Sequence, residues 1–388
     1  MKNTILLPIN ILFVICISCA FYGCKTATND VPTLIQVNLA TSSPYLLRDK
    51  FTLKQIVPLD TAALLNSDKI NYITVFNNQL FVTCYEDPTI FVFNLKSGKL
   101  EYKIDRSGRG PEEYTNSPRI AMYSEETILI EDFAGAIKSY DLQGNYKQGT
   151  DSVITSNKLF SIINVNDSTF LISKELLGLY FHKDLSKPYY SVDLVNHKGK
   201  IIKKMVERDA TLPKIPVRSA KNQFYKFKNR IYLCPLTENN IYNFDEKDST
   251  LKCLYSIDIN NSSVNNAFEE QRHTPAAIFF KKIYVLNIAA VTNRYFLISA
   301  DRQKGESRYI LIDRSNNSTT VYDRNTNEDM NLGRFIANDK GMAIQLVNYF
   351  DLIDDNGIVI NTPLVDKIRE YVKIDENMNP VLSIYSQK

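Results

Sequence analysis

From about residue 71 onward, short runs of β-branched and aromatic residues alternate with clusters of polar turn residues. Within these runs apolar and polar positions tend to alternate, which is typical of strands with one buried face. A recurrent mark is a strand end followed by Asn or Asp, then a turn, then another strand. The pattern predicts repeated hairpin units 47 to 68 residues apart, marked by Asn94, Asp141, Asn196, Asp245 and Asp313.

A repeat of this length predicts a β-propeller, because four short strands with hairpin turns make up one blade. Three of the turns carry a glycine where a tight hairpin needs a positive φ angle. These glycines are Gly98, Gly144 and Gly199. An upstream strand precedes each mark, as in "NQLFVTCYE" and "NRYFLISA". Five marks therefore require at least five blades.

A sixth blade is predicted from the C-terminal region, where "GRFIANDKGMAIQLVN" supplies two strands and "NPVLSIYSQK" a third. We expect the fourth from the N-terminal region, either "LIQVNL" or "FTLKQIVPLD", because such closure protects open sheet edges. Apolar residues behind Pro363 recur at helical spacing and predict a short helix. They are Leu364, Val365, Ile368 and Val372. The predicted fold class is all-β, a six-bladed β-propeller of four-stranded antiparallel blades closed by pairing N- and C-terminal strands.

The first residues are typical of a targeting segment. Lys2 precedes the apolar run "ILLPINILFVICISCAFY", which is too short to count as a transmembrane helix of the mature protein. The run ends in "FYGC", a loose version of the bacterial lipoprotein box, so Cys24 is the expected lipidation site. We expect a signal peptide over 1–24, a flexible tether over 25–33 and the propeller over 34–388. The alternative is an ordinary secretory signal cut nearby.

Composition excludes several classes of function. The chain has 46 Lys and Arg against 43 Asp and Glu, a net charge of +3, so it has no concentrated basic field and we expect no nucleic-acid partner. With Cys24 lipidated and the signal removed, Cys84, Cys234 and Cys253 remain. They are too few and too scattered for a disulfide framework or a zinc site, and we expect buried thiols. We predict neither a metal nor a cofactor.

One long segment carries a family resemblance. The chain reads "LFVTCYEDPTIFVFNLKSGKLEYKIDRSGRGPEEY", in which paired strands are followed by a G-x-G-P-x-E-Y loop. This resembles the six-bladed β-propeller lipoproteins of the Bacteroidetes, a largely uncharacterised family related in shape to NHL and TolB-type propellers. The segments "LKQIVPLDTAALLNSDKI" and "NPVLSIYSQK" are similar to that family's sequence before the first blade and at the closing strand. The resemblance covers nearly all of the mature chain and implies the fold, while it says almost nothing about chemistry.

The loop "SGRGPEEY" in that segment has two interpretations. It is not a phosphate cradle, because a glutamate stands where a third glycine is needed and no Lys-Ser pair follows. Its glycines and proline suit a sharp turn between two blades. Inter-blade loops also open onto the axial end of a propeller, so the loop is a candidate binding surface. The candidate binding residues are Arg109, Glu112, Glu113 and Tyr114.

Catalytic candidates are few. The histidines are His182, His197 and His273, which excludes H-E-x-x-H and a local three-histidine zinc site. Propeller polysaccharide lyases use His, Tyr and Arg around a central cleft, so His273, Arg294 and Tyr295 are the catalytic candidates. A glycoside hydrolase needs two carboxylates ~5 to ~10 Å apart, and neighbours on a strand point to opposite faces.

The 23 Tyr and 20 Phe favour a binding surface, because such rings stack on sugars and pack against partners. We expect an envelope-anchored binding or scaffold propeller that recognises a protein or glycan partner through axial blade loops. We expect secretion across the inner membrane and attachment through lipid alone, at the outer membrane. The alternative function is a carbohydrate-active enzyme, a polysaccharide lyase or glycoside hydrolase, that uses the axial cleft.

Overall fold

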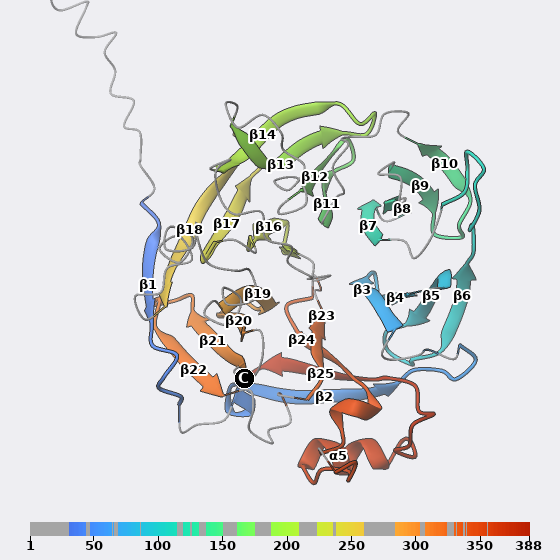
Figure 1. The fold of residues 1–388 in the computed structure, drawn as a ribbon, viewed down its shortest axis with the longest axis vertical. Coiled ribbons are helices and arrows are strands. Elements are labelled where there is room, and N and C mark those ends of the chain that lie inside the picture. The colour runs from blue at the N-terminus through green and yellow to red at the C-terminus, as the bar shows by residue number, and fades with distance from the viewer. Residues whose placement is uncertain are drawn as a thin grey trace, which may run out of the picture. The chain divides into compact units, whose positions relative to one another are not determined.

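The computed structural model describes residues 31–388 except for several connections, and it arranges them as six sheets in a closed ring (Figure 1). The predicted signal peptide, Cys24 and most of the predicted tether lie outside the described residues. The connections outside the description are 44–46, 64, 66–68, 86, 115–118, 125, 132–136, 150–160, 175–187, 209–222, 236–237, 260–283, 303–306, 324–329, 331, 337, 339 and 355.

Each sheet forms one blade, and its antiparallel strands run from the axis to the rim in the ring (Figure 1). Blade 1 consists of β3 (Ile70–Phe76), β4 (Gln79–Cys84), β5 (Asp87–Asn94) and β6 (Leu100–Ile104). Blade 2 consists of β7 (Arg119–Ser124), β8 (Thr127–Glu131), β9 (Ile137–Asp141) and β10 (Tyr146–Gly149). Blade 3 consists of β11 (Ser161–Asn166), β12 (Thr169–Ser173), β13 (Tyr189–Asn196) and β14 (Ile201–Arg208).

The other three blades repeat this order. Blade 4 consists of β15 (Phe224–Phe227), β16 (Arg230–Leu233), β17 (Asn240–Asp245) and β18 (Thr250–Ile259). Blade 5 consists of β19 (Tyr284–Val291), β20 (Tyr295–Arg302), β21 (Ser307–Asp313) and β22 (Thr319–Asp323). Blade 6 consists of β23 (Arg334–Ile336), β24 (Ala343–Val347), β25 (Val381–Gln387) and β2 (Phe51–Pro58). The first strands of neighbouring blades contact each other around the ring, which confirms the six-bladed propeller.

Both N-terminal candidates for the closing strand form strands, but only one closes the ring. In β2, Phe51 lies opposite Gln387 and Pro58 opposite Val381, so "FTLKQIVP" is the rim strand of blade 6. The other segment forms β1 (Thr33–Val37), which pairs in parallel with β18 as a fifth strand of blade 4. The predicted closure is confirmed, and the fifth strand is an addition that the sequence did not indicate.

The antiparallel strands define two ends of the ring. The turns after the first and third strands lie at one end, which we call the hairpin end. The turn after the second strand and the connection to the next blade lie at the other, the connection end. Candidate residues can belong to one site only if they lie at the same end of the ring.

The apolar core is divided among the interfaces between blades. The largest cluster joins blades 4 and 5, where the ring of Tyr232 meets that of Phe296 edge-on at 4.9 Å. Among the described residues, the cluster between blades 2 and 3 is the smallest of the six. Its buried members are Leu129, Ile137, Ile162, Phe170, Ile172 and Val195.

The Asn or Asp that marks each repeat ends the third strand of a blade and holds the turn that follows. The Oδ1 atom of Asn94 accepts the backbone N–H groups of Lys96 and Ser97 at 3.0 and 3.1 Å. Asn196, Asp245 and Asp313 each accept the N–H two residues later at 3.0 Å, and so does Asp141. Asn and Asp place an acceptor at the right distance for this turn, and Ser and Thr do so more weakly, which explains why Asn or Asp marks the repeat.

These third-strand turns also pack against the rim strand of the preceding blade. Gly98 has a φ angle of +70°, and a Cβ atom there would lie 1.9 Å from the carbonyl oxygen of Pro58 in blade 6. Gly144 has a φ angle of +85°, and its Cβ would lie 2.6 Å from Ile104 Cγ2 in blade 1. The turns therefore connect neighbouring blades at the rim, and glycine permits both the backbone angle and the close approach.

The predicted helix is present as α5 (Pro363–Arg369), in the connection after the second strand of blade 6. Thr362 Oγ1 accepts the N–H of Val365 at 3.3 Å and caps its first turn. Leu364, Val365 and Ile368 are fully buried against blade 6. The helix ends before Val372, which the periodicity had included, although that side chain still packs against the same cluster. Two short 3₁₀ helices, η1 (Leu47–Lys50) and η4 (Tyr349–Asp351), complete the helical structure that the described residues contain.

We predict that Gly98→Ala destabilises the protein more than Gly357→Ala. Both glycines have a positive φ, of +70° and +75°, but nothing lies within 4 Å of a Cβ at Gly357. The control should lose about 1 kcal/mol from backbone conformation alone. Gly98→Ala should lose more than about 2 kcal/mol, because its Cβ also meets the Pro58 carbonyl. Urea unfolding measures both losses, and equal values would show that the turn does not press on blade 6.

We also predict that stability falls in acid because of the turn aspartates. Hydrogen bonds from Lys252 lower the pKa of Asp245. Burial would raise the pKa of Asp141 and Asp313, but hydrogen bonds to Asn145 and Ser315 outweigh it, so both values are lowered. A lowered folded-state pKa stabilises the protein above the unfolded value of about 3.9.

The free energy of unfolding should therefore lose this contribution as the pH falls from about 4 through the lowered pKa values. Asp→Asn at all three positions keeps the Oδ1 acceptor, as Asn94 and Asn196 do naturally, but removes the titration. Urea unfolding at pH 7, 5 and 3.5 compares the free energy of unfolding of the triple variant with that of the unaltered protein. The triple variant should lose less stability between pH 5 and 3.5, and an unchanged loss would assign acid sensitivity to other groups.

Candidate functional site

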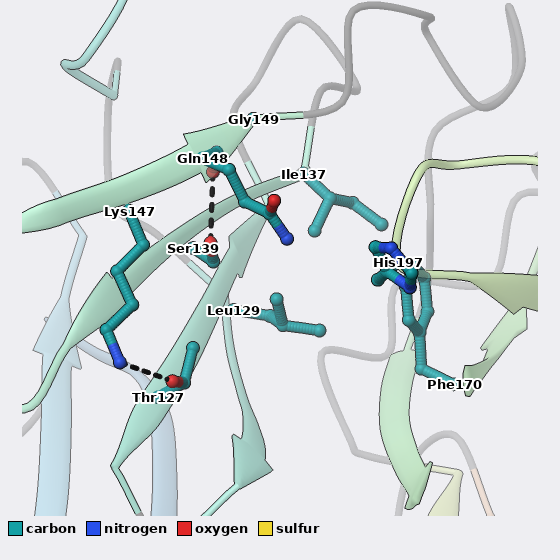
Figure 2. A pocket seen from close by; sticks show the side chains of 9 residues that line it. All are labelled: Thr127, Leu129, Ile137, Ser139, Lys147, Gln148, Gly149, Phe170 and His197. Carbon is teal, nitrogen blue, oxygen red and sulfur yellow. Dashed lines mark hydrogen bonds between the residues drawn. The ribbon is translucent and has the colours of Figure 1, made fainter. Parts of the chain in front are cut away.

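A pocket of about 240 Å³ opens between blades 2 and 3 (Figure 2). Its walls come from three strands of blade 2, and from β12 and the third-strand turn of blade 3. The lining residues are Thr127, Leu129, Ile137, Ser139, Lys147, Gln148, Gly149, Phe170 and His197. The pocket therefore lies at the interface whose described apolar cluster is the smallest.

The apolar floor follows from the alternation of side chains along two paired strands. Leu129 of β8 lies directly opposite Ser139 of β9, so both point to the same face of blade 2. Ile137 lies two residues before Ser139 and shares that face. Leu129, Ile137 and Phe170 are 5%, 2% and 1% exposed, so they form a rigid apolar base that is part of the inter-blade core.

Polar groups surround this floor. Lys147 Nζ donates to Thr127 Oγ1 at 2.9 Å, and Ser139 Oγ donates to the Gln148 carbonyl oxygen at 3.1 Å. The side chains of Gln148 and His197 face the space from opposite walls in Figure 2, and both residues are exposed. The rim thus presents an ammonium, an amide, an imidazole and two hydroxyls above an apolar base.

The chemistry of this lining does not suit a glycoside hydrolase. Lys147 is the only lining residue with a full charge, and none of the nine has a carboxyl group. A glycoside hydrolase needs two carboxyl groups across the scissile bond, which these residues do not supply. An apolar wall with a few convergent polar groups is instead the usual composition of a small-ligand pocket.

A buried ion pair lies farther along the same face of blade 3. Lys174 Nζ is 2.6 Å from Asp193 Oδ2, and their side chains are 6% and 0% exposed. Asp193 lies directly opposite Ile172, a member of the cluster between blades 2 and 3. Burial raises the pKa of Asp193, and the Lys174 ammonium opposes that shift. Removing either partner would leave a buried charge unpaired, so this interface depends on both.

The structure places the four predicted binding residues in the connection from blade 1 to blade 2, at the connection end. Arg109 and Glu112 are exposed there. Tyr114 is fully buried, and its hydroxyl donates to the Ile104 carbonyl oxygen at 3.1 Å. Burial is the main reason why the pKa of Tyr114 is raised. Tyr114 therefore supports the loop from within, and only part of the predicted group faces solvent.

Glu113 also supports the loop. Its Oε2 atom accepts the N–H of Gly110 at 2.8 Å. A Cβ atom on Gly108 would lie 1.8 Å from the same oxygen, so glycine is needed for the carboxylate to fold back over the loop. The two glycines of the motif therefore make room for a carboxylate of the chain itself.

The structure does not bring the catalytic candidates together with that loop. His273 lies outside the described residues. Arg294 and Tyr295 lie where β19 turns into β20, at the hairpin end, opposite the loop. Arg294 Nε bonds Asp313 Oδ2 at 2.7 Å, and its guanidinium carbon lies 5.2 Å from the centre of the Tyr295 ring. Tyr295 is only 6% exposed, so these contacts stabilise blade 5.

The described residues contain no group of three His, Cys, Asp or Glu side chains that could hold a metal ion. Cys84 and Cys234 are buried as expected, but Cys253 is only half-buried because it lies on rim strand β18. Burial raises the pKa of the Cys84 thiol to about 11, so it is protonated at neutral pH.

The fold and this pocket define a six-bladed β-propeller with a pocket between two of its blades. The chain belongs to the family described as "Domain of unknown function (DUF4934)", whose sequence model matches residues 33–386. No curated protein matches the chain.

Several solved structures are similar to this chain. The crystal structure named "Putative exported protein", from Bacteroides fragilis NCTC 9343, shares 15% identity and has a TM-score of 0.68. The match covers 92% of this chain and 100% of that one. The structure of U3-55K shares 11% identity with a TM-score of 0.45, over 85% of this chain and 98% of that chain. The RRP9 WD40 repeats share 10% identity with a TM-score of 0.44, over 87% of this chain and 100% of that chain.

The Bacteroides fragilis structure agrees with the fold at the level of architecture. Within the part of the chain that the structure describes, no helix is both long and apolar enough to cross a membrane.

Proposed function

We propose that this chain is a cell-envelope binding protein that holds a sugar unit of a glycan in the pocket between blades 2 and 3. The observation that carries the proposal is the composition of the pocket, an apolar floor below a rim of uncharged donors and one ammonium. The C–H face of a sugar packs on an apolar base, and its hydroxyls bond to polar groups around the rim.

The size and rigidity of the pocket support this proposal. Its floor residues belong to the inter-blade core, so they are already in place before a ligand arrives, which reduces the entropy that binding must overcome. A volume of about 240 Å³ is small for a whole oligosaccharide but suits one unit at the end or side of a chain. The glycoside hydrolase alternative has no such support, because the lining has no carboxyl group.

The envelope location rests on the sequence. The apolar segment before Cys24 and the "FYGC" motif support secretion and lipidation at that residue. Two or more acyl chains would hold the propeller at a membrane and raise its concentration near surface glycans. We propose the outer membrane as that membrane.

We predict that Lys147→Ala combined with His197→Ala weakens glycan binding at least about tenfold without changing the melting temperature, because the variants remove rim groups only. Lys198→Ala is the matched control, since Lys198 is exposed beside His197 but does not line the pocket. A glycan array followed by calorimetry measures binding. Equal binding by the unaltered chain, the double variant and the control would place the glycan site elsewhere. If the protein bound no glycan but captured a protein, the partner would be a protein and not a glycan.

We also predict that Cys24→Ala moves the protein from the membrane fraction to the soluble fraction of the envelope, because the acyl attachment site is lost. Radiolabelled palmitate should enter the unaltered chain and not the variant. Lys25→Ala, next to the attachment site, should leave both results unchanged. A variant that stays with the membrane and an unlabelled parent chain would point to an ordinary signal cleaved nearby.

A further inference from the structure

A second group of interest lies at the connection end of the ring, where blade 6 meets blade 1. Arg334 is the first residue of β23, the strand of blade 6 nearest the axis. It pairs with Leu346 of β24. The preceding Gly333 has a φ angle of +77°, and a Cβ there would lie 2.2 Å from the Leu346 carbonyl oxygen. The backbone on both sides of Arg334 is therefore fixed against β24.

One edge of the Arg334 guanidinium has no partner. Both Nε and Nη2 are buried, and neither has a hydrogen-bond partner among the described residues. The N–H bonds of these two nitrogens point in the same direction and form the fork with which arginine binds a carboxylate side-on. Burial lowers the pKa of Arg334, but an arginine side chain stays charged in proteins. A full positive charge is thus held with its bidentate edge unused.

The groups that face Arg334 do not neutralise it. Burial is the largest influence on its pKa, and Asp351, Tyr85 and Cys84 oppose that influence only in part. Asp351 belongs to η4, and its Oδ2 atom accepts the backbone N–H of Asn348 at 2.8 Å. Tyr85 follows β4 in blade 1 and is 48% exposed, so the solvent boundary lies close to the guanidinium. All of these residues lie at the connection end.

The charged residues of the innermost strands also favour an anionic ligand. The six strands nearest the axis contain no Asp or Glu, and each of their charged residues is a cation. These residues are Arg119, Lys226 and Arg334. Of the two whose side chains the structure describes, Lys226 has a partner, because its Nζ bonds Asn164 Oδ1 at 3.2 Å. Among the described residues, Arg334 has no such partner on its bidentate edge, and buried donors without a partner lower stability.

We propose that Arg334 anchors a carboxylate-binding site at the connection end between blades 6 and 1. The ligand is a small organic acid or sugar acid whose two carboxylate oxygens accept the N–H groups of Nε and Nη2. Tyr85, which is half-exposed and faces Arg334 from blade 1, contacts the body of the ligand. This site is separate from the pocket between blades 2 and 3, so either can exist without the other.

The test measures the melting temperature and calorimetric binding of the full-length chain in acetate, glucuronate, phosphate or chloride at one ionic strength. Acetate and glucuronate should raise the melting temperature relative to chloride, because they bind only the folded state. Arg334→Lys keeps the charge but loses the fork, so it should weaken acetate and glucuronate binding at least about tenfold. Arg334→Met should abolish binding and, in chloride, raise the melting temperature, because it removes an unpaired buried charge.

Lys226→Met is the matched control, since it removes the other described cation of the inner strands and should leave the response to carboxylates unchanged. Three results would overturn the proposal. One is an equal response to chloride and to the carboxylates, and another is binding of phosphate alone. The third is a fall in melting temperature in chloride for both Arg334 variants together with an unchanged carboxylate response, which would give Arg334 a structural role. If Arg334→Met does not fold, the Arg334→Lys affinity decides the outcome.

Discussion

The fold depends on the turn that follows the third strand of a blade. An Asn or Asp side chain holds the turn by accepting backbone N–H groups, as Asn94 and Asp141 do. Because the turn is fixed, its tip can press against the rim strand of the preceding blade, as Gly98 does against Pro58. The same local contact thus sets the hairpin within one blade and the spacing to its neighbour. The contact is present at blades 1 and 2, where it joins each turn to the rim strand of the blade before it.

The two proposed sites lie where this regular packing changes. Blades 2 and 3 share the smallest described apolar cluster, and a pocket and a buried ion pair flank it. Blades 6 and 1 meet where the chain closes the ring, and the Arg334 guanidinium lies at that junction. Among the described residues, the largest inter-blade cluster joins blades 4 and 5. Variation in a repeated fold therefore supplies the positions where chemistry can be placed without loss of the architecture.

The sequence predicted what is encoded locally and left open what depends on distant contacts. The turn marks were recognisable because an Asx turn needs a particular residue at a particular position. Both "LIQVNL" and "FTLKQIVPLD" had the alternation of a strand, and only the pairing partners β18 and β25 separate the fifth strand from the closing one. Tyr114 looked like a surface residue of a polar loop, yet its hydroxyl is satisfied by Ile104 inside the core. Lys147 and His197 share no local motif, because their pocket exists only after two blades have packed.

The N-terminal strand gives the ring a mechanical protection. β1 lies on the rim of blade 4, and the chain then passes blade 5, where the Ser43 N–H bonds the Val321 carbonyl oxygen at 2.7 Å, before it enters blade 6 as β2 (Figure 1). A pulling force applied ahead of Thr33 therefore reaches the β1–β18 pairing first. Five residue pairs must separate before any tension reaches β2, the strand whose loss would open the ring. A protein that is pulled from its N-terminal side would shed this outer strand and keep the propeller intact.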